Sequence, residues 1–210
     1  MNRTVSPELL DSLPADSAAA RHSRRDLQWF NRLLGNDGWW RRTLPQYQSI
    51  GRGLEIGAGD GQLALRFDLD ALDLQSSPEG WPHHRKWHTS DVGLFAHWHD
   101  YPLVVSNLFL HHLQTEQLTQ LGRIWNDTAQ TLICCEPWRV RGFGVGFSLL
   151  CAVIRAHRVS RHDGRVSIEA GFRDNELPEA LGLDKKIWEW RISHTVRGMY
   201  RMVAQRRDLK

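Results

Sequence analysis

The segment Glu55–Gly61 has the residue types and the spacing of a ligand-binding turn. It reads Glu-Ile-Gly-Ala-Gly-Asp-Gly, and its glycines let the backbone bend sharply and approach a ligand, because no Cβ intervenes. An apolar run, 53–56, precedes the bend, and the pattern of residues 62–67 predicts a helix after it. The free N–H groups at the start of that helix would add hydrogen-bond donors to the site.

The glycine spacing and the charge beside it bear on which ligand the turn accepts. A dinucleotide fold has the pattern G-x-G-x-x-G, with a pyrophosphate on the helix N-terminus. This sequence has G-x-G-x-G, with Glu55 before it and Asp60 inside it, and two carboxylates would repel a pyrophosphate. S-adenosylmethionine carries a sulfonium, an ammonium and a ribose diol but no phosphate, so acidic neighbours favour it. A nicotinamide or flavin site, and a tight turn without a ligand, remain as alternative interpretations.

A further acid, Asp73, lies in the next apolar run, 71–74. A carboxylate at this strand end can accept hydrogen bonds from both ribose hydroxyls, by the same logic as in dinucleotide folds. Asp70 lies nearby, but the sequence Ala71-Leu72-Asp73 places Asp73 better. A solvated acid at the end of a strand is the alternative interpretation.

Histidines are the candidate acid–base groups of this chain. His111 and His112 follow the predicted strand 103–107, at the edge of the sheet where ligands bind in such folds. His162 precedes Asp163, and a carboxylate that meets an imidazole in space tunes its pKa. We therefore predict His112 and His162 as catalytic residues. The alternatives are a helix-cap or core hydrogen-bonding role for His112 and a structural loop role for His162.

Apolar runs alternate with helical patterns along the middle of the chain. Strands are predicted at 53–56, 71–74, 103–107 and 131–135, and helices at 62–67 and 116–129. Near the end, the two-residue alternation of 188–192, the turn residue Gly198 and the run 199–204 predict an antiparallel hairpin. The predicted fold class is therefore α/β, with a doubly wound, mostly parallel sheet that closes with a C-terminal antiparallel hairpin.

The residues before this sheet are predicted to form an N-terminal helical extension, 1–48, ahead of a ligand-binding domain at 49–210. Within the extension, Ser23-Arg24-Arg25-Asp26 resembles a capping box, with Asp in place of the usual Glu. Apolar residues follow at helical spacing, and Gly35 is a suitable stop for the helix. A chain of 210 residues is long enough for one sizeable core.

The composition is that of an ordinary globular protein, with 41% hydrophobic and 24% charged residues. The net charge of +3 permits a nucleic-acid partner but does not favour one, because the basic residues are spread along the chain. Cys134, Cys135 and Cys151 have no metal-like spacing, so we expect buried free thiols, no metal site and a reducing cytoplasm. No leader is visible, and the longest apolar run, 143–154, is shorter than the ~20 residues of a membrane span.

Taken together, the motifs resemble those of the class I S-adenosylmethionine-dependent methyltransferases. The first motif of that family is hydrophobic-Glu/Asp-hydrophobic-Gly-x-Gly-x-Gly, and residues 53–61 match it without a gap. The resemblance continues through Asp73, Ser90-Asp91-Val92, 103–108 and 132–137, and the C-terminal hairpin fits the last two strands of the family. It implies a seven-stranded Rossmann-like sheet and S-adenosylmethionine as the cofactor.

The same resemblance implies a role for each matching residue. The glycine turn would surround the amino-acid part of the donor, and Asp73 would bind its ribose. Asp91 would accept a hydrogen bond from the adenine amino group, with Val92 beside the ring, and Asn107 would lie near the methyl group. The predicted cofactor-binding residues are therefore Glu55, Gly57, Ala58, Gly59, Gly61, Asp73, Leu74, Asp91, Val92 and Asn107.

The whole chain is also similar to small methyltransferases of bacterial polyketide and phenolic-lipid biosynthesis. This similarity lies in Asp26-Leu27, 108–113, Arg161-His162-Asp163 and Ala170-Gly171-Phe172. It implies O-methylation of a phenolic or polyketide-like small molecule, and the absence of an Asn-Pro-Pro-Tyr-type sequence after 103–107 weakens N-methylation of a planar nitrogen. The alternatives are a methyltransferase acting on RNA or protein and a catalytically silent S-adenosylmethionine-binding protein.

Overall fold

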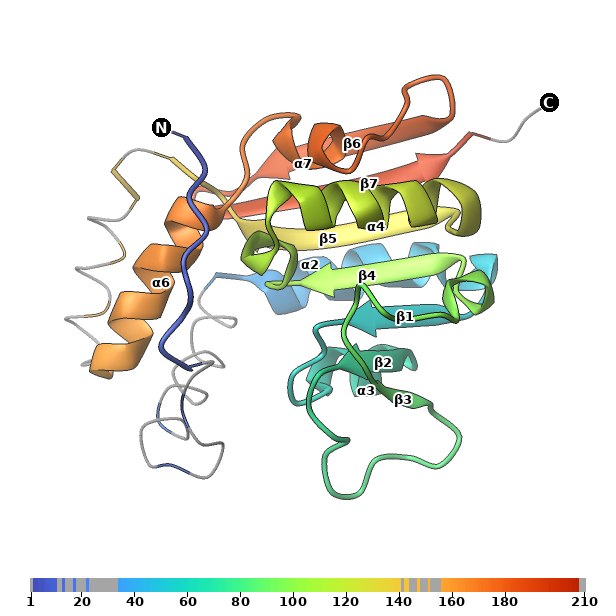
Figure 1. Ribbon diagram of the computed structural model, residues 1–210, viewed down its shortest axis with the longest axis horizontal. Coiled ribbons are helices and arrows are strands. Elements are labelled where there is room, and N and C mark those ends of the chain that lie inside the picture. The colour runs from blue at the N-terminus through green and yellow to red at the C-terminus, as the bar shows by residue number, and fades with distance from the viewer. Residues whose placement is uncertain are drawn as a thin grey trace.

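The computed structural model describes residues 2–10, 13, 17, 22, 34–140, 142, 143, 147, 151 and 156–207. These residues form a seven-stranded sheet in the order β3-β2-β1-β4-β5-β7-β6, with helices on both faces (Figure 1). The strands are β1 (Gly53–Ile56), β2 (Asp70–Asp73), β3 (Trp87–Thr89), β4 (Leu103–Asn107), β5 (Thr131–Pro137), β6 (Trp188–His194) and β7 (Met199–Arg206). The α-helices are α2 (Asn36–Thr43), α3 (Gln62–Phe67), α4 (Thr115–Thr128), α6 (Arg158–Ala170) and α7 (Glu176–Ala180). Short 3₁₀ turns are η2 (Leu44–Gln46), η3 (Gln48–Ile50), η4 (Trp98–Asp100) and η5 (Leu110–His112).

The sheet is parallel from β3 across to β5 and closes with a hairpin. Strand β7 is antiparallel to both of its neighbours, β5 and β6. The hairpin turns at Gly198, whose φ of +84° suits glycine. The predicted α/β fold with a doubly wound, mostly parallel seven-stranded sheet and a C-terminal antiparallel hairpin is confirmed.

The predicted bounds of β1, α3 and β4 agree with the structure. Strand β2 is shifted toward the N-terminus by one residue, because Asp70 pairs with Leu54 of β1. Strand β5 continues beyond the predicted end to Pro137, where it still pairs with Met199 of β7. The helix predicted at 116–129 is observed one residue earlier, as α4. The sequence patterns do not predict β3, α6 or α7.

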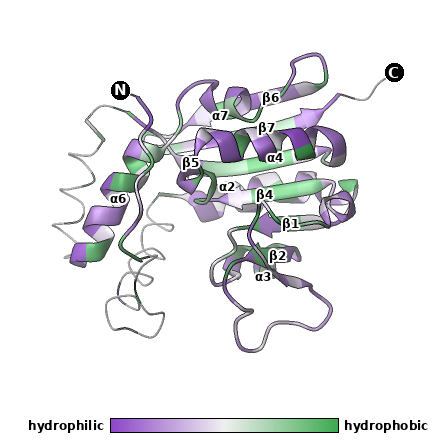
Figure 2. Ribbon diagram, in the orientation of Figure 1, coloured by the Kyte–Doolittle hydropathy of each residue, from purple (hydrophilic) through white to green (hydrophobic). Residues whose placement is uncertain are grey.

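Both faces of the sheet are buried, as the alternation along β4 shows. Val104 belongs to a core that includes Trp125 of α4. Its neighbours Leu103 and Val105 point to the opposite face and belong to a second core with Trp40 of α2. Because both faces are covered, the central strands are nearly continuous apolar runs. Figure 2 shows this contrast between hydrophobic central strands and the hydrophilic outer surface of α4.

The N-terminal region contributes to the structure in two places. Trp40 and Leu44 are fully buried in the second core. Residues 2–10 form a segment that lies beside α6 (Figure 1), and we call it the N-terminal strap. The helix predicted after 23–26 begins outside the described residues, and the domain division at residue 48 stays a prediction.

Two predictions from composition also concern the described residues. Cys134 and Cys135 are free and buried, and Cys151 is buried, as predicted. Burial raises the pKa of the Cys135 thiol to about 12, which keeps it in the unreactive thiol form. In the part of the chain that the structure describes, no helix is long and apolar enough to cross a membrane.

Helix α4 approaches the chain after α7 so closely that only glycine fits at position 122. A Cβ on Gly122 would lie 1.7 Å from the carbonyl oxygen of Leu181. Alanine would gain about 1 kcal/mol in helix propensity, but overpacking of this kind costs about 1–3 kcal/mol or more.

We therefore expect Gly122→Ala to lower the free energy of unfolding, measured by urea denaturation, despite the better helix former. The matched control is Gln120→Ala, an exposed position of the same helix, which should stay within about 0.5 kcal/mol of the wild type. Equal stability of the two variants would contradict this account of the contact between α4 and Leu181.

Candidate active site

The glycine turn lies at the carboxyl ends of the parallel strands, where the strand order reverses. From β1 the chain continues outward to β2 and β3, and it then returns to β4 on the other side of β1. Ligands bind in such crevices of open α/β sheets. Two cavities, of about 730 Å³ and about 510 Å³, open here, and Gly57 and Gly59 line both.

The turn is sharp because its glycines adopt the left-handed backbone conformation. Gly57 and Gly59 have φ of +61° and +58°, which a residue with a Cβ rarely adopts. A Cβ on Gly57 would lie 2.2 Å from the ring of Phe109, whereas a Cβ on Gly59 would meet no atom within 4 Å. The backbone at Gly59 is therefore open to the close approach of a ligand.

Two carboxylates are held against this turn by backbone N–H groups. The buried Glu55 accepts a hydrogen bond from Ala64 N–H at 2.7 Å, across from β1 to α3. Asp73, at the end of β2, accepts from Gly59 N–H at 2.8 Å and from Gln75 N–H at 2.9 Å. These bonds fix both carboxylates beside the open backbone of the turn.

The electrostatics of the turn favour a cation. Burial raises the pKa of Glu55 to about 8, and the charges of Asp60 and Asp73 add to the increase, against an opposing hydrogen bond from Ala64. Three carboxyl groups thus share a small space, and the charges of Asp60 and Asp73 disfavour the ionisation of Glu55. A positive group of a ligand placed here would relieve that repulsion.

The remaining predicted donor residues lie along the walls of the two cavities. Asp91 is exposed, and its Oδ1 accepts from Gly93 N–H at 2.7 Å, while the adjacent Val92 is buried. Asn107, at the end of β4, lines the smaller cavity, and its Oδ1 accepts from Trp40 Nε1–H at 3.2 Å. Helix α2 therefore fixes the orientation of the Asn107 amide.

Most of the predicted site residues come together around the cavities. Those that line one or both are Glu55, Gly57, Ala58, Gly59, Asp73, Leu74, Asp91, Val92, Asn107 and His112. Gly61 is not among the lining residues, and a Cβ there would instead lie 2.5 Å from the ring of Trp81. His162 is not among them either. It lies in helix α6 rather than in a loop, half-exposed, with Nδ1 at 3.0 Å from Asp163 Oδ1.

At the other end of the larger cavity, a buried carboxylate organises the turn η5. Glu136 is fully buried at the end of β5. It accepts hydrogen bonds from Ser106 Oγ–H at 2.8 Å, from Leu110 N–H at 3.0 Å and from His111 Nδ1 at 2.8 Å. Burial disfavours its charge, but the hydrogen bond and charge of His111 outweigh burial and hold the pKa of Glu136 below its usual value.

The two neighbouring histidines of η5 have opposite electrostatic environments. For His111, the two carboxylates Glu136 and Glu8 outweigh the effect of burial and raise its pKa to about 9. For His112, burial, with the charge of His111 adding to it, lowers the pKa to about 4. At neutral pH, His112 therefore presents an uncharged imidazole to the cavity.

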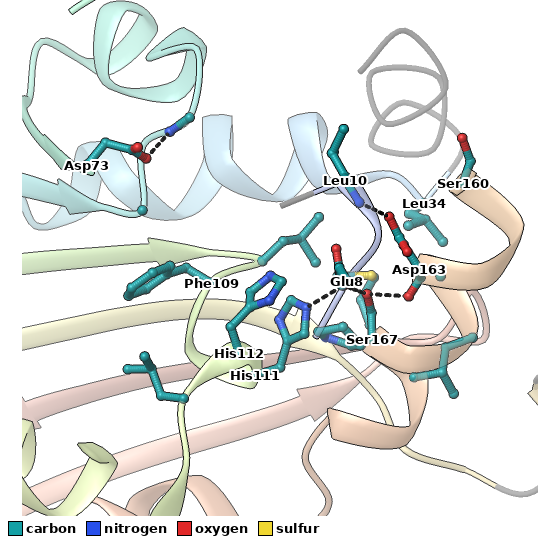
Figure 3. Close-up of a pocket in the computed structure, with 18 of the residues that line it drawn as sticks. Glu8, Leu10, Leu34, Asp73, Phe109, His111, His112, Ser160, Asp163 and Ser167 are labelled. Carbon is teal, nitrogen blue, oxygen red and sulfur yellow. Dashed lines mark hydrogen bonds and ion pairs between the residues drawn. The ribbon is translucent and has the colours of Figure 1, made fainter. Parts of the chain in front are cut away.

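The N-terminal strap completes this end of the cavity. Arg3 donates to the carbonyl oxygens of His111 and Leu113 at 2.9 Å and 2.7 Å. Leu9 and Leu10 donate their N–H groups to the carboxylate of Asp163 in α6, at 2.8 Å and 2.9 Å. Figure 3 shows the result, with Glu8 of the strap between the histidines of η5 and the side chains of α6.

Sequence reasoning missed three contributors to this end of the site. Glu136 carried a usable signal, because a lone acid after the apolar residues 132–135 must find partners if it is buried. Glu8 and Ser167, which share a hydrogen bond, carried none. They lie far apart in the sequence, and only the tertiary structure brings them together.

Several solved structures share this fold at low sequence identity. The plantazolicin methyltransferase BpumL, in complex with a monoazolic desmethylPZN analog and SAH, has a TM-score of 0.67 at 11% identity over 93% of this chain and 91% of that chain. The magnesium protoporphyrin IX methyltransferase ChlM from Synechocystis PCC 6803, with bound SAH, has 0.55 at 14% identity over 92% and 96%. The 1,6-didemethyltoxoflavin-N1-methyltransferase of Burkholderia thailandensis has 0.54 at 17% identity over 98% and 94%. This chain has the Rossmann-like methyltransferase fold.

Neither a protein-family model nor a curated protein matches the sequence. The similarity to the methyltransferase structures therefore lies in the fold. It extends over nearly the whole of this chain and of the three structures compared, so the sheet, the helices on its two faces and the closing hairpin are shared as one architecture.

The raised pKa of Glu55 predicts a specific pH dependence of stability. Between pH 4.5 and about 8, the folded protein holds a proton on Glu55 that the unfolded chain has lost. The stability that this proton contributes is fully present below pH 4.5 and is lost as the pH rises through 8, by up to about 1.4 kcal/mol per pH unit. Glu55→Gln, which keeps an oxygen for Ala64 N–H, should therefore become progressively more stable than the wild type across this range.

Urea unfolding of both proteins at a series of pH values measures the difference directly. Glu79→Gln, at an exposed loop position, is the control and should follow the wild-type profile. Parallel profiles for Glu55→Gln and the wild type would show that Glu55 is ionised at neutral pH and would overturn this assignment.

Proposed function

We propose that this protein is an S-adenosylmethionine-dependent methyltransferase that acts on a small molecule. The observation that carries the proposal is the open backbone at Gly59 beside the carboxyl groups of Glu55, Asp60 and Asp73. Such a turn suits a nucleoside that is cationic and free of phosphate. The SAH complexes among the structures of similar fold support the same ligand.

The donor would occupy both cavities across the glycine turn. Its ammonium group would lie near Glu55 and Asn107, which line the smaller cavity. Its ribose would bind Asp73, and its adenine would lie between Val92 and Asp91 in the larger cavity. The sulfonium would then lie near Gly57 and face the remaining volume of the larger cavity.

The acceptor would bind in that remaining volume, which has mainly apolar walls. Phe109, Leu113, Ile168 and Met199 line it. Flat apolar walls suit an aromatic acceptor, and we propose O-methylation of a phenolic or polyketide-like molecule. His112 faces the same space with a neutral ring whose lone pair is available to the acceptor group.

In methyl transfer the sulfonium of the donor already activates the methyl group, so the protein need not supply that activation. An acceptor oxygen attacks the methyl carbon, the bond from that carbon to sulfur breaks, and its electron pair stays on sulfur, which becomes a neutral thioether. The proton of the hydroxyl would pass to His112 or to water as the oxygen attacks. The main task of the chain is to align the two reactants and exclude water, which the N-terminal strap would help to do by covering the acceptor end.

Two alternative functions would give different results in a methyl-transfer assay. A methyltransferase acting on RNA or protein would need a basic surface beside the donor cavity, and the spread of basic residues along the sequence does not favour one. A catalytically silent binding protein would bind the donor without transferring its methyl group.

Donor binding is tested by calorimetry with a substitution at the open backbone. We expect Gly59→Val to reduce the affinity for S-adenosylhomocysteine by at least about 100-fold, because its side chain would occupy the space of the ligand and strain the turn. Gly182→Val is the matched control, since Gly182 has a similar φ of +63°, also meets no atom within 4 Å and lies outside both cavities. Equal loss in the two variants would mean that backbone strain, not ligand contact, explains the effect.

Acceptor class is tested with a labelled methyl donor offered to phenols, quinones and tRNA. We expect transfer to a phenolic compound, and His112→Gln should lower its turnover by about 100-fold while the donor affinity stays within a factor of two. Transfer to tRNA alone would overturn the choice of a small-molecule acceptor. Donor binding with no transfer to any acceptor would favour the silent binding protein.

A further inference from the structure

A second group of side chains, away from the glycine turn, faces the larger cavity (Figure 3). It consists of Glu8, His111 and His112. One nitrogen or carboxylate oxygen of each lies within 4.8 Å of those of the other two. His111 Nε2 is 3.8 Å from Glu8 Oε1. The strap thus places a carboxylate over two adjacent imidazoles at the wall of the cavity.

Glu136 fixes the orientation of the His111 ring. Its carboxylate can only accept a hydrogen bond, so His111 Nδ1, at 2.8 Å, carries the hydrogen that joins them. The other ring nitrogen, Nε2, is 3.8 Å from Glu8 Oε1 and carries a proton at neutral pH, so an ion would bind there by displacing that proton. Histidines that bind metal ions commonly donate their other N–H to a carboxylate, which holds the ring in place.

The ring of His112 is a second available nitrogen ligand. Its centroid lies 4.2 Å from that of His111, and the planes are tilted by 36°. Among the described residues, the interactions of its ring are this contact and the electrostatic influence of its charged neighbours. An ion pair between Glu8 and His111 alone would not need this second imidazole.

The spacing of Glu8 and His111 is close to what a metal ion requires, and a ligand atom of His112 lies within 4.8 Å of both. Zinc binds histidine nitrogen and carboxylate oxygen at about 2.0–2.2 Å, so ligand atoms at tetrahedral corners lie roughly 3.3 Å apart. The distance from His111 Nε2 to Glu8 Oε1 exceeds this by only about 0.5 Å. Glu8 lies outside any helix or strand, and a small adjustment of its side chain would complete the geometry.

We propose that Glu8, His111 and His112 bind one divalent transition-metal ion of the zinc type, with a fourth coordination position open to the cavity. Two histidines and one glutamate are a known ligand set of zinc sites that keep an open position. Imidazole ligands select such ions over magnesium and calcium. This proposal departs from the sequence-based expectation of no metal site, which rested on the spacing of the cysteines.

The ion would serve two purposes in the molecule. It would tie the strap to η5, in addition to the hydrogen bonds that Arg3 donates there. Leu9 and Leu10 join the strap to α6 through Asp163. Its open position would orient an oxygen of the acceptor toward the donor, and this second purpose rests on the proposed function. With the ion bound, the lone pair of His112 would bind the ion, so the ion rather than the ring would contact the acceptor oxygen. Metal binding itself does not, because its ligands are distinct from the residues assigned to the donor.

The test is metal binding by the untagged full chain in the absence of any donor. We expect one Zn²⁺ per chain by equilibrium dialysis after removal of metals with a chelator, and a visible absorption band for bound Co²⁺ typical of four-coordination. Glu8→Gln and His112→Gln should each weaken Zn²⁺ binding more than about 100-fold. Losing a residue that only hydrogen-bonds to a ligand costs up to about 100-fold in metal affinity, and loss of a ligand itself should cost more. Magnesium should not compete.

Two controls separate the site from adventitious binding and from the donor assignment. His99→Gln removes an exposed histidine of η4 and should leave Zn²⁺ affinity unchanged. Glu8→Gln keeps an oxygen for Ser167 Oγ–H, so it should fold as the wild type does, which circular dichroism checks. The absence of tight Zn²⁺ binding to the wild type, or wild-type affinity in His112→Gln, would overturn the proposal. Either outcome would leave S-adenosylhomocysteine binding by calorimetry unaffected.

Discussion

The buried carboxylate of Glu136 is the constraint on which the acceptor end of the site depends. A charge with no exposure to water needs several partners, and Glu136 takes them from Ser106 of β4 and from the backbone and ring of η5. These hydrogen bonds hold η5, the turn after β4, against the end of β5. Leu108 makes this possible with a left-handed φ of +58°, a strained conformation for a residue with a side chain. His111 and His112 face the cavity because this turn holds them there.

At the glycine turn, an open backbone and nearby carboxyl groups act together. The left-handed turn at Gly59 leaves space beside the main chain, while the hydrogen bonds from Ala64 and Gly59 hold Glu55 and Asp73 against it. The charges of Asp60 and Asp73 would repel a dinucleotide phosphate and attract a sulfonium or an ammonium, and such a cation would also favour the ionised form of Glu55. The two cavities, which share Gly57 and Gly59, thus join an acidic region at the glycine turn to an apolar region that carries a neutral and a charged imidazole.

The sequence predicted the parts of this structure that local patterns specify. Strand β1, the glycine turn and α3 follow one another with clear turn and helix signals, and their bounds agree with the structure. Helix α6 gave no such signal, because two of its buried positions are the polar Ser160 and Asp163. Asp163 is buried because it receives the N–H groups of the strap, a contact between distant parts of the chain. Strand β3 has three residues at the edge of the sheet, too few to show an alternation.

The candidate site also has one part that local sequence patterns predicted and one part that depends on contacts between distant segments. The predicted cofactor-binding residues other than Gly61 lie together because they occur at or after successive strand ends, whereas Gly61 makes room for Trp81. The acceptor end depends on Glu8, Glu136 and α6, which sequence spacing does not relate to one another. His112, predicted because it follows a strand end, lines the larger cavity, whereas His162 is half-exposed on α6 and contacts Asp163, which lines that cavity.

A crystal structure of this protein grown with S-adenosylhomocysteine tests the central claim most directly. The account predicts the nucleoside across the glycine turn, with its ribose hydroxyls on Asp73, its amino-acid part near Glu55 and its sulfur facing the apolar cavity. Density for the nucleoside at another place, or a turn that admits a pyrophosphate compound but not this ligand, would contradict it.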